Sequence, residues 1–264
     1  MIPAVLSIAG SDASGGAGIQ ADIKTIASHK LYAETVITAL TAQNTTGVAG
    51  VLPIEPAFIR AQMDSVFADI RPDAVKIGMV PTSDAAQAIA AGLVAADAAH
   101  VVLDPVMVAT SGATLADSPA VAGIVAHLLP LAEIVTPNIP EAQVLAGREI
   151  ATREDREEAA RAIQGKMRAG AWVLVKGGHA SDTADDLLLT EHGRCVWLPH
   201  KLIDTPNTHG TGCTLSSAIA CGLAAGFDVQ ASVSKAKQYV TGALECDLGM
   251  GRGAGPIDHM WQYR

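Results

Sequence analysis

The sequence predicts an α/β fold built on a mostly parallel sheet. Its 264 residues are 49% hydrophobic but only 3% aromatic, which suits helices packed tightly on a sheet better than an aromatic-rich β sandwich. Short β-branched runs alternate with longer helical patterns. Strands separated by crossovers of this length pair in parallel, with right-handed connections. Because no repeat, linker or shift of composition marks a boundary, we expect one domain over residues 1–264.

The first half of the chain predicts two β-to-α units. A strand over 5–9 leads through a glycine-rich turn to a helix over 19–28, and a strand over 35–42 leads through residues 43–47 to a second helix. The apolar face of that helix recurs every three or four positions, as an amphipathic helix requires: Ile59, Met63, Val66 and Ile70. Four further short strands are expected, with helical stretches between nearly all of them: 74–77, 101–103, 134–136 and 173–176.

The pattern changes in the last third. Runs at 185–189 and 195–198 flank a hairpin-like turn at 191–194, which predicts an antiparallel edge to the sheet. Two helices close the chain, and a glycine-rich tail follows at 249–256. The first of these helices covers 212–224, and the second has the apolar face Val233, Ala236, Val240 and Leu244.

Composition excludes several classes of function. The formal net charge is −9 with a pI near 5.3, and lysines and arginines are scattered, so we expect neither a nucleic-acid nor a membrane partner. No apolar run is long enough to span a bilayer. The first residues lack the basic stretch of a signal peptide, and the cysteines form no C-x-x-C pair: Cys195, Cys213, Cys221 and Cys246. We therefore expect a reduced, cytoplasmic protein.

The most specific motif is Thr-His-Gly-Thr-Gly-Cys-Thr at 208–214, where a polar run turns into an Ala-rich helical pattern. Glycines let the main chain approach a phosphate, and the unpaired N–H groups and dipole of a helix N-terminus attract an anion. This motif predicts an anion cradle whose first helical turn carries Cys213. By these residues alone, the thiol is either a catalytic group or a small buried side chain.

Polar residues also follow several predicted strands, where ligands of parallel sheets bind. Asp104 suits a water-coordinated Mg²⁺, although a turn former is an equal alternative. Asn138 and Glu141 lie three positions apart and share a helix face, where they either converge on an ion or cap the helix. Lys176 either neutralises a transferring phosphoryl group or is a solvated surface lysine. Together with the cradle, these residues predict phosphoryl transfer.

A glycine-rich loop at 10–18 follows the first strand. It is not a Walker A loop, because no Gly-Lys-Ser or Gly-Lys-Thr closes it, and it does not fit G-x-G-x-x-G. It is either a tight structural turn or a ligand loop, and its Asp and Ser content favours the ligand. The missing fingerprint argues against a dinucleotide-dependent oxidoreductase.

Six segments, in order and over nearly the whole chain, resemble the bacterial hydroxymethylpyrimidine/phosphomethylpyrimidine kinases of thiamine biosynthesis: residues 10–22, 41–45, 76–79, 104–107, 136–142 and 209–214. The resemblance implies a ribokinase-like three-layer αβα sandwich with a mostly parallel central sheet and an antiparallel edge, and a homodimer. It also implies ATP and Mg²⁺. The expected acceptors are 4-amino-5-hydroxymethyl-2-methylpyrimidine and then its monophosphate.

Carried over position by position, the resemblance assigns the site residues. The pyrimidine contacts would be Gly10, Ala17, Gln43, Met79 and Val106; the metal supports Asp104 and Glu141; the nucleotide contacts Asn138, Lys176, Thr211 and Gly212; and the catalytic positions Cys213, Gly210, Gly212 and Lys176. The carboxamide of Gln43 can read an amino group beside a ring nitrogen. Met79 and Val106 can sandwich a flat ring, although both would serve equally as ordinary core.

Cys213 stands where many sugar kinases of the superfamily place an aspartate base. A helix N-terminus can lower a thiol's pKa, so that the thiolate accepts the proton of the hydroxymethyl group. Against this, bound polyphosphate raises the pKa of a neighbouring thiol, and a loose transition state needs little help from a base. We expect a direct role, with a Cys213→Ala change lowering kcat more than it raises KM.

Two other functions fit the same residues less well. A pyridoxal or pyridoxine kinase is the alternative enzyme, although relatives with that activity place a cysteine in the loop at 109–112, which this chain lacks. Thr110 in this loop stands where close relatives often carry a lysine, which puts a charged lid contact in doubt. A binding protein without catalysis would lack part of the phosphoryl-transfer set, and Asp104, Glu141 and Cys213 are all present.

Overall fold

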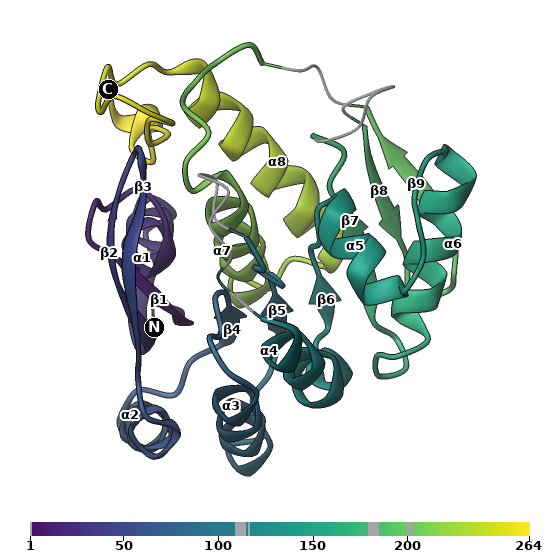
Figure 1. Cartoon of the computed structure of the whole chain (residues 1–264), viewed down its shortest axis with the longest axis horizontal. Coiled ribbons are helices and arrows are strands. Elements are labelled where there is room, and N and C mark those ends of the chain that lie inside the picture. Colours follow the sequence, from purple (N-terminus) through teal and green to yellow (C-terminus); the bar gives the residue numbers. More distant parts are fainter. Residues whose placement is uncertain (1, 109–114, 116, 179–184, 200–202) are drawn as a thin grey trace.

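A nine-stranded sheet forms the centre of the molecule (Figure 1). The structure is a computed structural model that describes residues 2–108, 115, 117–178, 185–199 and 203–264. Its strands lie in the order β3-β2-β1-β4-β5-β6-β7-β8-β9. They span β1 Ala4–Asp12, β2 Tyr32–Asn44, β3 Gly47–Pro53, β4 Ala74–Ile77, β5 Val101–Leu103, β6 Ile134–Val135, β7 Trp172–Val175, β8 Asp186–Leu189 and β9 Cys195–Leu198.

Strands β2, β1, β4, β5, β6 and β7 pair in parallel, so their carboxyl ends meet at one edge. At the far end β8 and β9 pair antiparallel, and the backbone of Thr190 and Arg194 closes their turn. The antiparallel edge predicted from the sequence is therefore confirmed.

Helices cover both faces of the sheet and make a three-layer sandwich (Figure 1). The main helices are α1 Gly18–Ser28, α2 Pro56–Asp69, α3 Ser83–Ala95, α4 Ser118–Gly123, α5 Ile139–Ala146, α6 Arg153–Gln164, α7 Thr211–Ala224 and α8 Val229–Glu245. One buried apolar cluster joins the sheet to α2, α3, α5 and α6, and a second joins it to α1, α7 and α8. Side chains alternate between the two clusters along β1, as Val5 and Leu6 illustrate. The predicted αβα fold is confirmed.

The sequence reading missed β3. Residues 43–47 were expected to lead directly to a helix, but the Asn44 side chain accepts hydrogen bonds from the backbone N–H and the hydroxyl of Thr46, at 2.9 and 2.6 Å. This side-chain turn reverses the chain, and β3 then returns antiparallel along the second half of β2. The sheet consequently has a second antiparallel edge, next to the glycine-rich loop.

The predicted apolar face of α2 is correct only in part. Ile59 and Met63 are fully buried, but Ile70 lies beyond the end of the helix and is 42% exposed. The backbone becomes extended at Ile70, two residues before Pro72, and a following proline disfavours helix at the position before it. The face of α8 fits better, since Val233, Ala236 and Val240 are buried.

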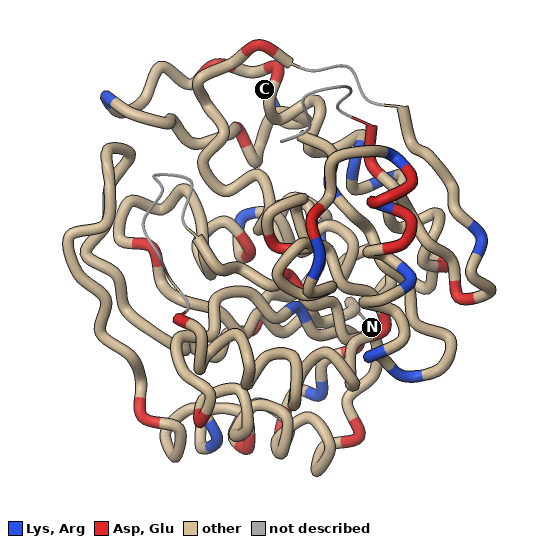
Figure 2. The backbone as a smooth tube through the Cα atoms, turned by 45° about the vertical axis from the view of Figure 1, so that its right-hand side comes forward, with Lys and Arg blue, Asp and Glu red and all other residues tan. Residues whose placement is uncertain are grey.

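Figure 2 shows acidic and basic residues of the described chain interspersed along the backbone. Within the described residues, no helix is both long and apolar enough to cross a membrane.

Candidate active site

The carboxyl ends of β5, β6 and β7 bring three charged side chains together. Asp104 directly follows β5, Lys176 directly follows β7, and Glu141 lies in the first turn of α5, which begins just after β6. The Lys176 Nζ atom donates to Asp104 Oδ1 at 3.0 Å and lies 4.0 Å from Glu141 Oε2. Thr136, after β6, also donates to Asp104 Oδ1, at 3.2 Å. The convergence predicted from strand ends is therefore present.

The N-terminus of α7 lies directly against this cluster. A Cβ atom added to Gly212 would lie 3.4 Å from Lys176 Nζ and 3.5 Å from Asp104 Oδ2. Gly210 precedes the helix with φ of 85°, a left-handed conformation that glycine adopts without strain, and no side chain caps the helix among the described residues. Thr211 occupies the first helical position and donates its hydroxyl to Thr208 O at 2.8 Å. The first turn thus offers backbone N–H groups beside a lysine ammonium, as an anion cradle requires.

Asn138 and Glu141 form the helix cap that the sequence left as an alternative. The Asn138 side chain accepts the Glu141 N–H at 2.9 Å, and the Glu141 carboxylate accepts the Asn138 N–H at 2.8 Å. Burial raises the pKa of the Glu141 carboxyl above its usual range, with Lys176 opposing this shift and Asp104 adding to it. Capping therefore uses one oxygen of each side chain and still leaves Glu141 beside Lys176.

The donor set fits a magnesium ion held largely through water. Mg²⁺ in phosphoryl-transfer sites uses one or two carboxylates together with water and phosphate oxygens. Asp104 and Glu141 supply two buried carboxylates on either side of Lys176. Among the described residues no group of three His, Cys, Asp or Glu side chains could enclose a metal by itself, so the fit is to a hydrated ion and not to an all-protein cage.

The predicted pyrimidine contacts fall into groups around the loop at 10–18. A Cβ atom added to Gly10 would lie 2.9 Å from Met79 Sδ, so these two residues touch, and Met79 is 7% exposed. Val106 is half-buried two residues after Asp104. Ala17 belongs to the loop itself and donates its N–H to Asp12 at 2.8 Å, while the Gln43 side chain, from β2, accepts from the Thr41 hydroxyl at 3.2 Å.

A buried pair that the sequence reading missed joins this loop to the anion cradle. His209 Nε2 lies 2.8 Å from Asp12 Oδ2 and 3.5 Å from the Gln43 carboxamide nitrogen. Asp12 also accepts backbone N–H groups of Ser14, Gly16 and Ala17. Burial alone would raise the Asp12 pKa, but hydrogen bonds from His209, Ser14 and Ala17 outweigh it and hold the pKa at about 2. The available signal was the position of His209 directly before Gly210, at the mouth of the cradle.

Cys213 lies in an environment that keeps its thiol protonated. Burial raises its pKa to about 11; Lys76 opposes this shift, while Asp22 and Asp104 add to it. This shift runs opposite to the lowering expected at a helix N-terminus, because desolvation and the two carboxylates outweigh the effect of Lys76. Lys76 and Asp22, which form a fully buried ion pair at 2.8 Å, were also missed as neighbours of the thiol.

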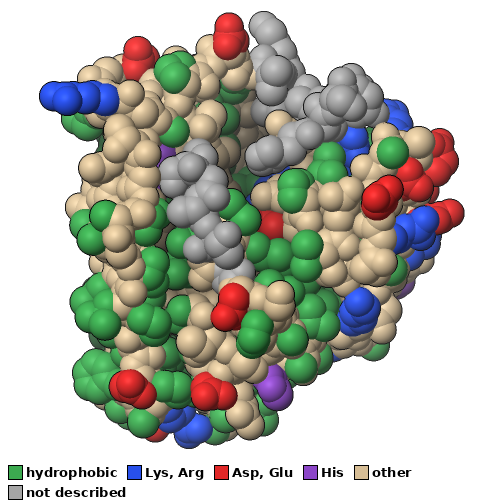
Figure 3. Space-filling model, in the orientation of Figure 1, with side chains coloured by type: hydrophobic (Ala, Val, Ile, Leu, Met, Phe, Trp, Pro, Cys, Tyr) green, Lys and Arg blue, Asp and Glu red, His purple; other side chains and the backbone are tan. Residues whose placement is uncertain are grey.

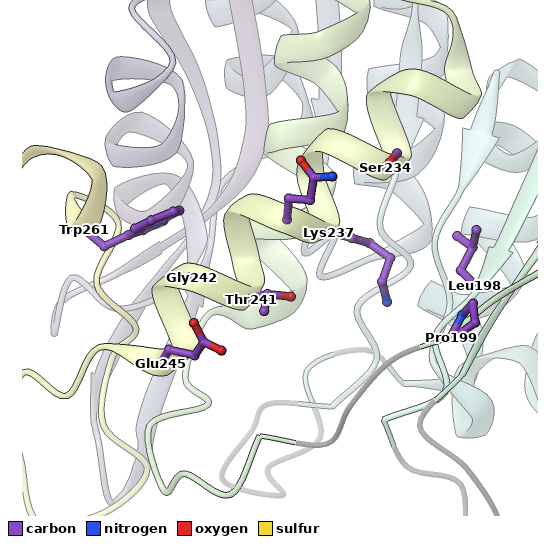
Figure 4. A pocket seen from close by; sticks show the side chains of 9 residues that line it. Leu198, Pro199, Ser234, Lys237, Thr241, Gly242, Glu245 and Trp261 are labelled. Carbon is purple, nitrogen blue, oxygen red and sulfur yellow. The ribbon is translucent and has the colours of Figure 1, made fainter.

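A pocket of about 440 Å³ opens between α8 and the end of β9 (Figure 4). Lys237, Gln238 and Thr241 line it from α8, facing Leu198 and Pro199. The Lys237 ammonium forms an ion pair with Asp186, whose other oxygen accepts the Gly177 N–H at 2.7 Å. Since Gly177 follows Lys176, two contacts connect the pocket to the cluster of Asp104, Glu141 and Lys176, which we call the phosphate cluster. Thr110 and the rest of 109–112 lie outside the described residues.

Comparisons with known proteins identify the family. The phosphomethylpyrimidine kinase family model matches residues 12–258. The hydroxymethylpyrimidine/phosphomethylpyrimidine kinase of Rhizobium meliloti (strain 1021) is 48% identical over 266 residues, which cover 100% of this chain and 99% of that protein. Its counterpart in Escherichia coli (strain K12) is 45% identical over 258 residues, covering 96% of each chain.

Solved structures agree with this result. The phosphomethylpyrimidine kinase from Clostridium difficile 630 aligns with a TM-score of 0.81 at 40% identity, over 90% of this chain and 98% of that one. The pyridoxal kinase from Staphylococcus aureus in complex with ADP aligns with a TM-score of 0.90 at 32% identity, over 100% and 96%. The chain therefore belongs to the phosphomethylpyrimidine kinase family.

Proposed function

We propose how the residues of this site divide the work of a hydroxymethylpyrimidine/phosphomethylpyrimidine kinase, which phosphorylates 4-amino-5-hydroxymethyl-2-methylpyrimidine and then its monophosphate in thiamine biosynthesis. The chain has this activity: relatives that carry it are 41–48% identical over nearly the whole chain. The observation that supports our assignment of roles is the Lys176 ammonium, held 3.0 Å from Asp104 over the first turn of α7.

Lys176 and the first turn of α7 would hold the phosphoryl group during transfer. Phosphoryl transfer depends on positioning and charge neutralisation more than on covalent chemistry. An ammonium beside backbone N–H groups would place positive charge next to the negatively charged equatorial oxygens of the transferring group. In this role Gly210 and Gly212 keep the backbone free of Cβ atoms, and Thr211 and Asn138 border the nucleotide phosphates.

Asp104 and Glu141 would support Mg²⁺ through water. When bound, the ion supplies charge neutralisation to the phosphate oxygens. The raised pKa of Glu141 also fits a carboxylate that needs a nearby cation. The pocket between α8 and β9 is our candidate for the nucleoside, because solved relatives bind ADP and because Lys237 connects this pocket to the turn after Lys176.

The acceptor would lie between Met79 and Val106, with Gln43 reading its amino edge. A thioether and a branched aliphatic side chain suit the two faces of a flat ring. His209, fixed by Asp12, would complete this wall beside Gln43. We assign Cys213 to the acceptor hydroxymethyl group as a neutral hydrogen-bonding thiol that orients it, since a thiol with a pKa of about 11 is protonated at neutral pH.

The acceptor is tested by measuring ADP release with the hydroxymethylpyrimidine, its monophosphate and pyridoxal in parallel. We expect turnover of both pyrimidines. Pyridoxal is the second candidate because pyridoxal kinases align over the whole chain at 31–35% identity. Turnover of pyridoxal alone would overturn the assignment, whereas turnover of all three would add a second activity.

We extend the proposal to a homodimer in a reducing, cytoplasmic setting, which the free cysteines fit. Figure 3 shows hydrophobic side chains gathered over α2 and the β2–β3 edge, where Leu52 and Phe58 are each 62% exposed. An apolar patch beside a sheet edge suits a second copy of the chain. Light scattering should give a dimer for the wild type and a monomer for Leu52→Glu/Phe58→Glu, whereas Val94→Glu on α3 should stay dimeric. A monomeric wild type would contradict this part.

A further inference from the structure

Asp186 joins three elements at the border between the phosphate cluster and the pocket of Figure 4. It begins β8 and is only 4% exposed. Its Oδ1 atom accepts the backbone N–H of Gly177 at 2.7 Å, and its Oδ2 atom pairs with the Lys237 ammonium from α8. One carboxylate therefore ties the turn after β7 to β8 and to α8.

The Gly177 contact bears directly on Lys176. The backbone N–H of Lys176 donates to Pro137 O at 2.8 Å, and the next N–H along the chain, that of Gly177, donates to Asp186. The main chain at Lys176 is thus held from both sides. The place of this short segment determines where the ammonium can meet Asp104, 3.0 Å away.

The Lys237 contact bears on the pocket. The side chain of Lys237 is 15% exposed and lines the pocket, and its ammonium would be free to move along the pocket wall without Asp186. Lysine side chains carry considerable rotamer freedom, which a fixed ion pair removes. The same carboxylate therefore fixes a positive charge at the pocket and a backbone turn at the phosphate cluster.

We propose that Asp186 is a positioning residue for phosphoryl transfer. It holds the turn that follows Lys176 and the Lys237 ammonium in fixed positions relative to each other. This inference rests on the proposed role of Lys176. A displacement of about 1 Å from a productive geometry is enough to cost about 10²-fold in rate. Loss of Asp186 would permit such a displacement, because it removes the acceptor of a buried N–H and the partner of a nearly buried cation.

The test compares Asp186→Ala and Asp186→Asn with a matched control. Asp258, near the C-terminus, is a comparable buried carboxylate with a more exposed partner: it is 2% exposed, accepts the Met260 N–H at 2.9 Å and pairs with Arg264, which is 64% exposed, at 2.6 Å. Asp258→Asn therefore measures what the loss of such a carboxylate does to stability alone. For each variant we would measure the melting temperature, kcat, and the KM values for ATP and for the hydroxymethylpyrimidine.

We expect Asp186→Ala to lower kcat by about 100-fold, and Asp186→Asn, whose amide oxygen can still accept the Gly177 N–H, by about tenfold. The KM for the pyrimidine should stay within about twofold, because neither Gly177 nor Lys237, the partners of Asp186, is among the proposed pyrimidine contacts. Asp258→Asn should lower the melting temperature by less than Asp186→Asn, because its arginine partner is exposed, and should leave kcat within about twofold. A kcat loss as large in Asp258→Asn as in Asp186→Asn would overturn the positioning role.

A Lys176→Met variant separates this inference from the proposed function. If Lys176→Met loses activity while both Asp186 variants keep kcat within about twofold of the wild type, the positioning role fails and the role of Lys176 stands. If Lys176→Met keeps its activity, the role of Lys176 fails first. Should Asp186→Ala not fold, Asp186→Asn carries the test by the same criterion.

Discussion

Two lysines near the ends of parallel strands each pair with an aspartate, yet their surroundings differ. Lys76, within β4, is fully buried and donates twice to Asp22, at 2.9 and 2.8 Å. Asp22 also accepts the hydroxyls of Ser7 and Ser217, at 2.5 and 2.7 Å. Lys176 is 17% exposed at its side chain, donates once to Asp104 at 3.0 Å, and lies 4.0 Å from Glu141.

The difference fits a structural role for the Asp22–Lys76 pair and the proposed phosphate-binding role for Lys176. Burying two charges is expensive, and the attraction between them repays it only when further hydrogen bonds satisfy both groups. Asp22 meets that condition through the hydroxyls of Ser7 and Ser217, and the pair links β4, β1, α1 and α7, so Asp22 has little left to offer a ligand. An ammonium has three donors, and the loosely paired Lys176 faces an uncapped helix N-terminus. In our proposal, this incomplete pairing leaves Lys176 available to a phosphate.

The largest effect on stability should come from breaking the buried Asp22–Lys76 ion pair. Lys76→Met leaves Asp22 charged in a dry environment, and removing one partner of a buried pair costs about 3–5 kcal/mol. Urea unfolding followed by circular dichroism would measure it. A Lys76→Met/Asp22→Leu double variant should recover part of the loss, because neither charge is then left alone. A single variant as stable as the wild type would show that this pair is not structural.

The cluster of Asp104, Glu141 and Lys176 was largely predictable from the sequence, whereas the buried Asp22–Lys76 pair was not. Asp104, Glu141 and Lys176 each follow a predicted strand, and parallel topology brings strand ends together, so their convergence needs no knowledge of side-chain packing. The partners of Lys76 and His209 depend on contacts between residues far apart, such as Asp12 and His209, which are 197 positions apart. The raised pKa of Cys213 depends on burial, which local patterns do not supply.

A second large effect concerns His259, a buried side chain that is 4% exposed. Burial lowers its pKa from 6.5 to about 4, with Lys24 and His209 adding to this and Asp258 opposing it. The unfolded chain binds the proton more readily, so stability falls as pH drops from about 6.5 to about 4, by up to about 3 kcal/mol. His259→Gln should flatten the stability curve in this window, as measured by urea unfolding at several pH values. An unchanged slope would contradict the assignment.

A smaller effect should follow from weakening the Asp104–Lys176 pair at its carboxylate. Asp104→Asn keeps the shape but removes the charge that would support Mg²⁺, and such changes cost about 10–100-fold in metal affinity or activity. Titrating Mg²⁺ into the variant, after chelation of trace metal, should show a weakened dependence of ADP release on the ion. The fold should survive, since the hydrogen bonds to Asp104, at 3.0 to 3.4 Å, are longer than those to Asp22, at 2.5 to 2.9 Å. An unaltered Mg²⁺ dependence would remove Asp104 from the metal site.

The smallest effect should come from Cys213, which lies between the two pairs. Cys213→Ala should lower kcat about tenfold with little change in the pyrimidine KM, and Cys213→Ser should retain most activity through its hydroxyl. Because the thiol pKa is about 11, the kcat profiles of wild type and Cys213→Ser should coincide between about pH 6 and 9. A wild-type ionisation near neutrality that disappears in Cys213→Ser would instead make the thiol a base.

The contrast between the two lysines is tested most directly by kcat and melting temperature of Lys176→Met, measured beside Lys76→Met. Donors aimed at developing charge are worth about 10²–10³-fold in kcat. We predict that Lys176→Met loses this much activity and melts close to the wild-type temperature, while Lys76→Met loses its stability first. A Lys176→Met protein that unfolds like Lys76→Met, or that keeps wild-type kcat, would contradict the account.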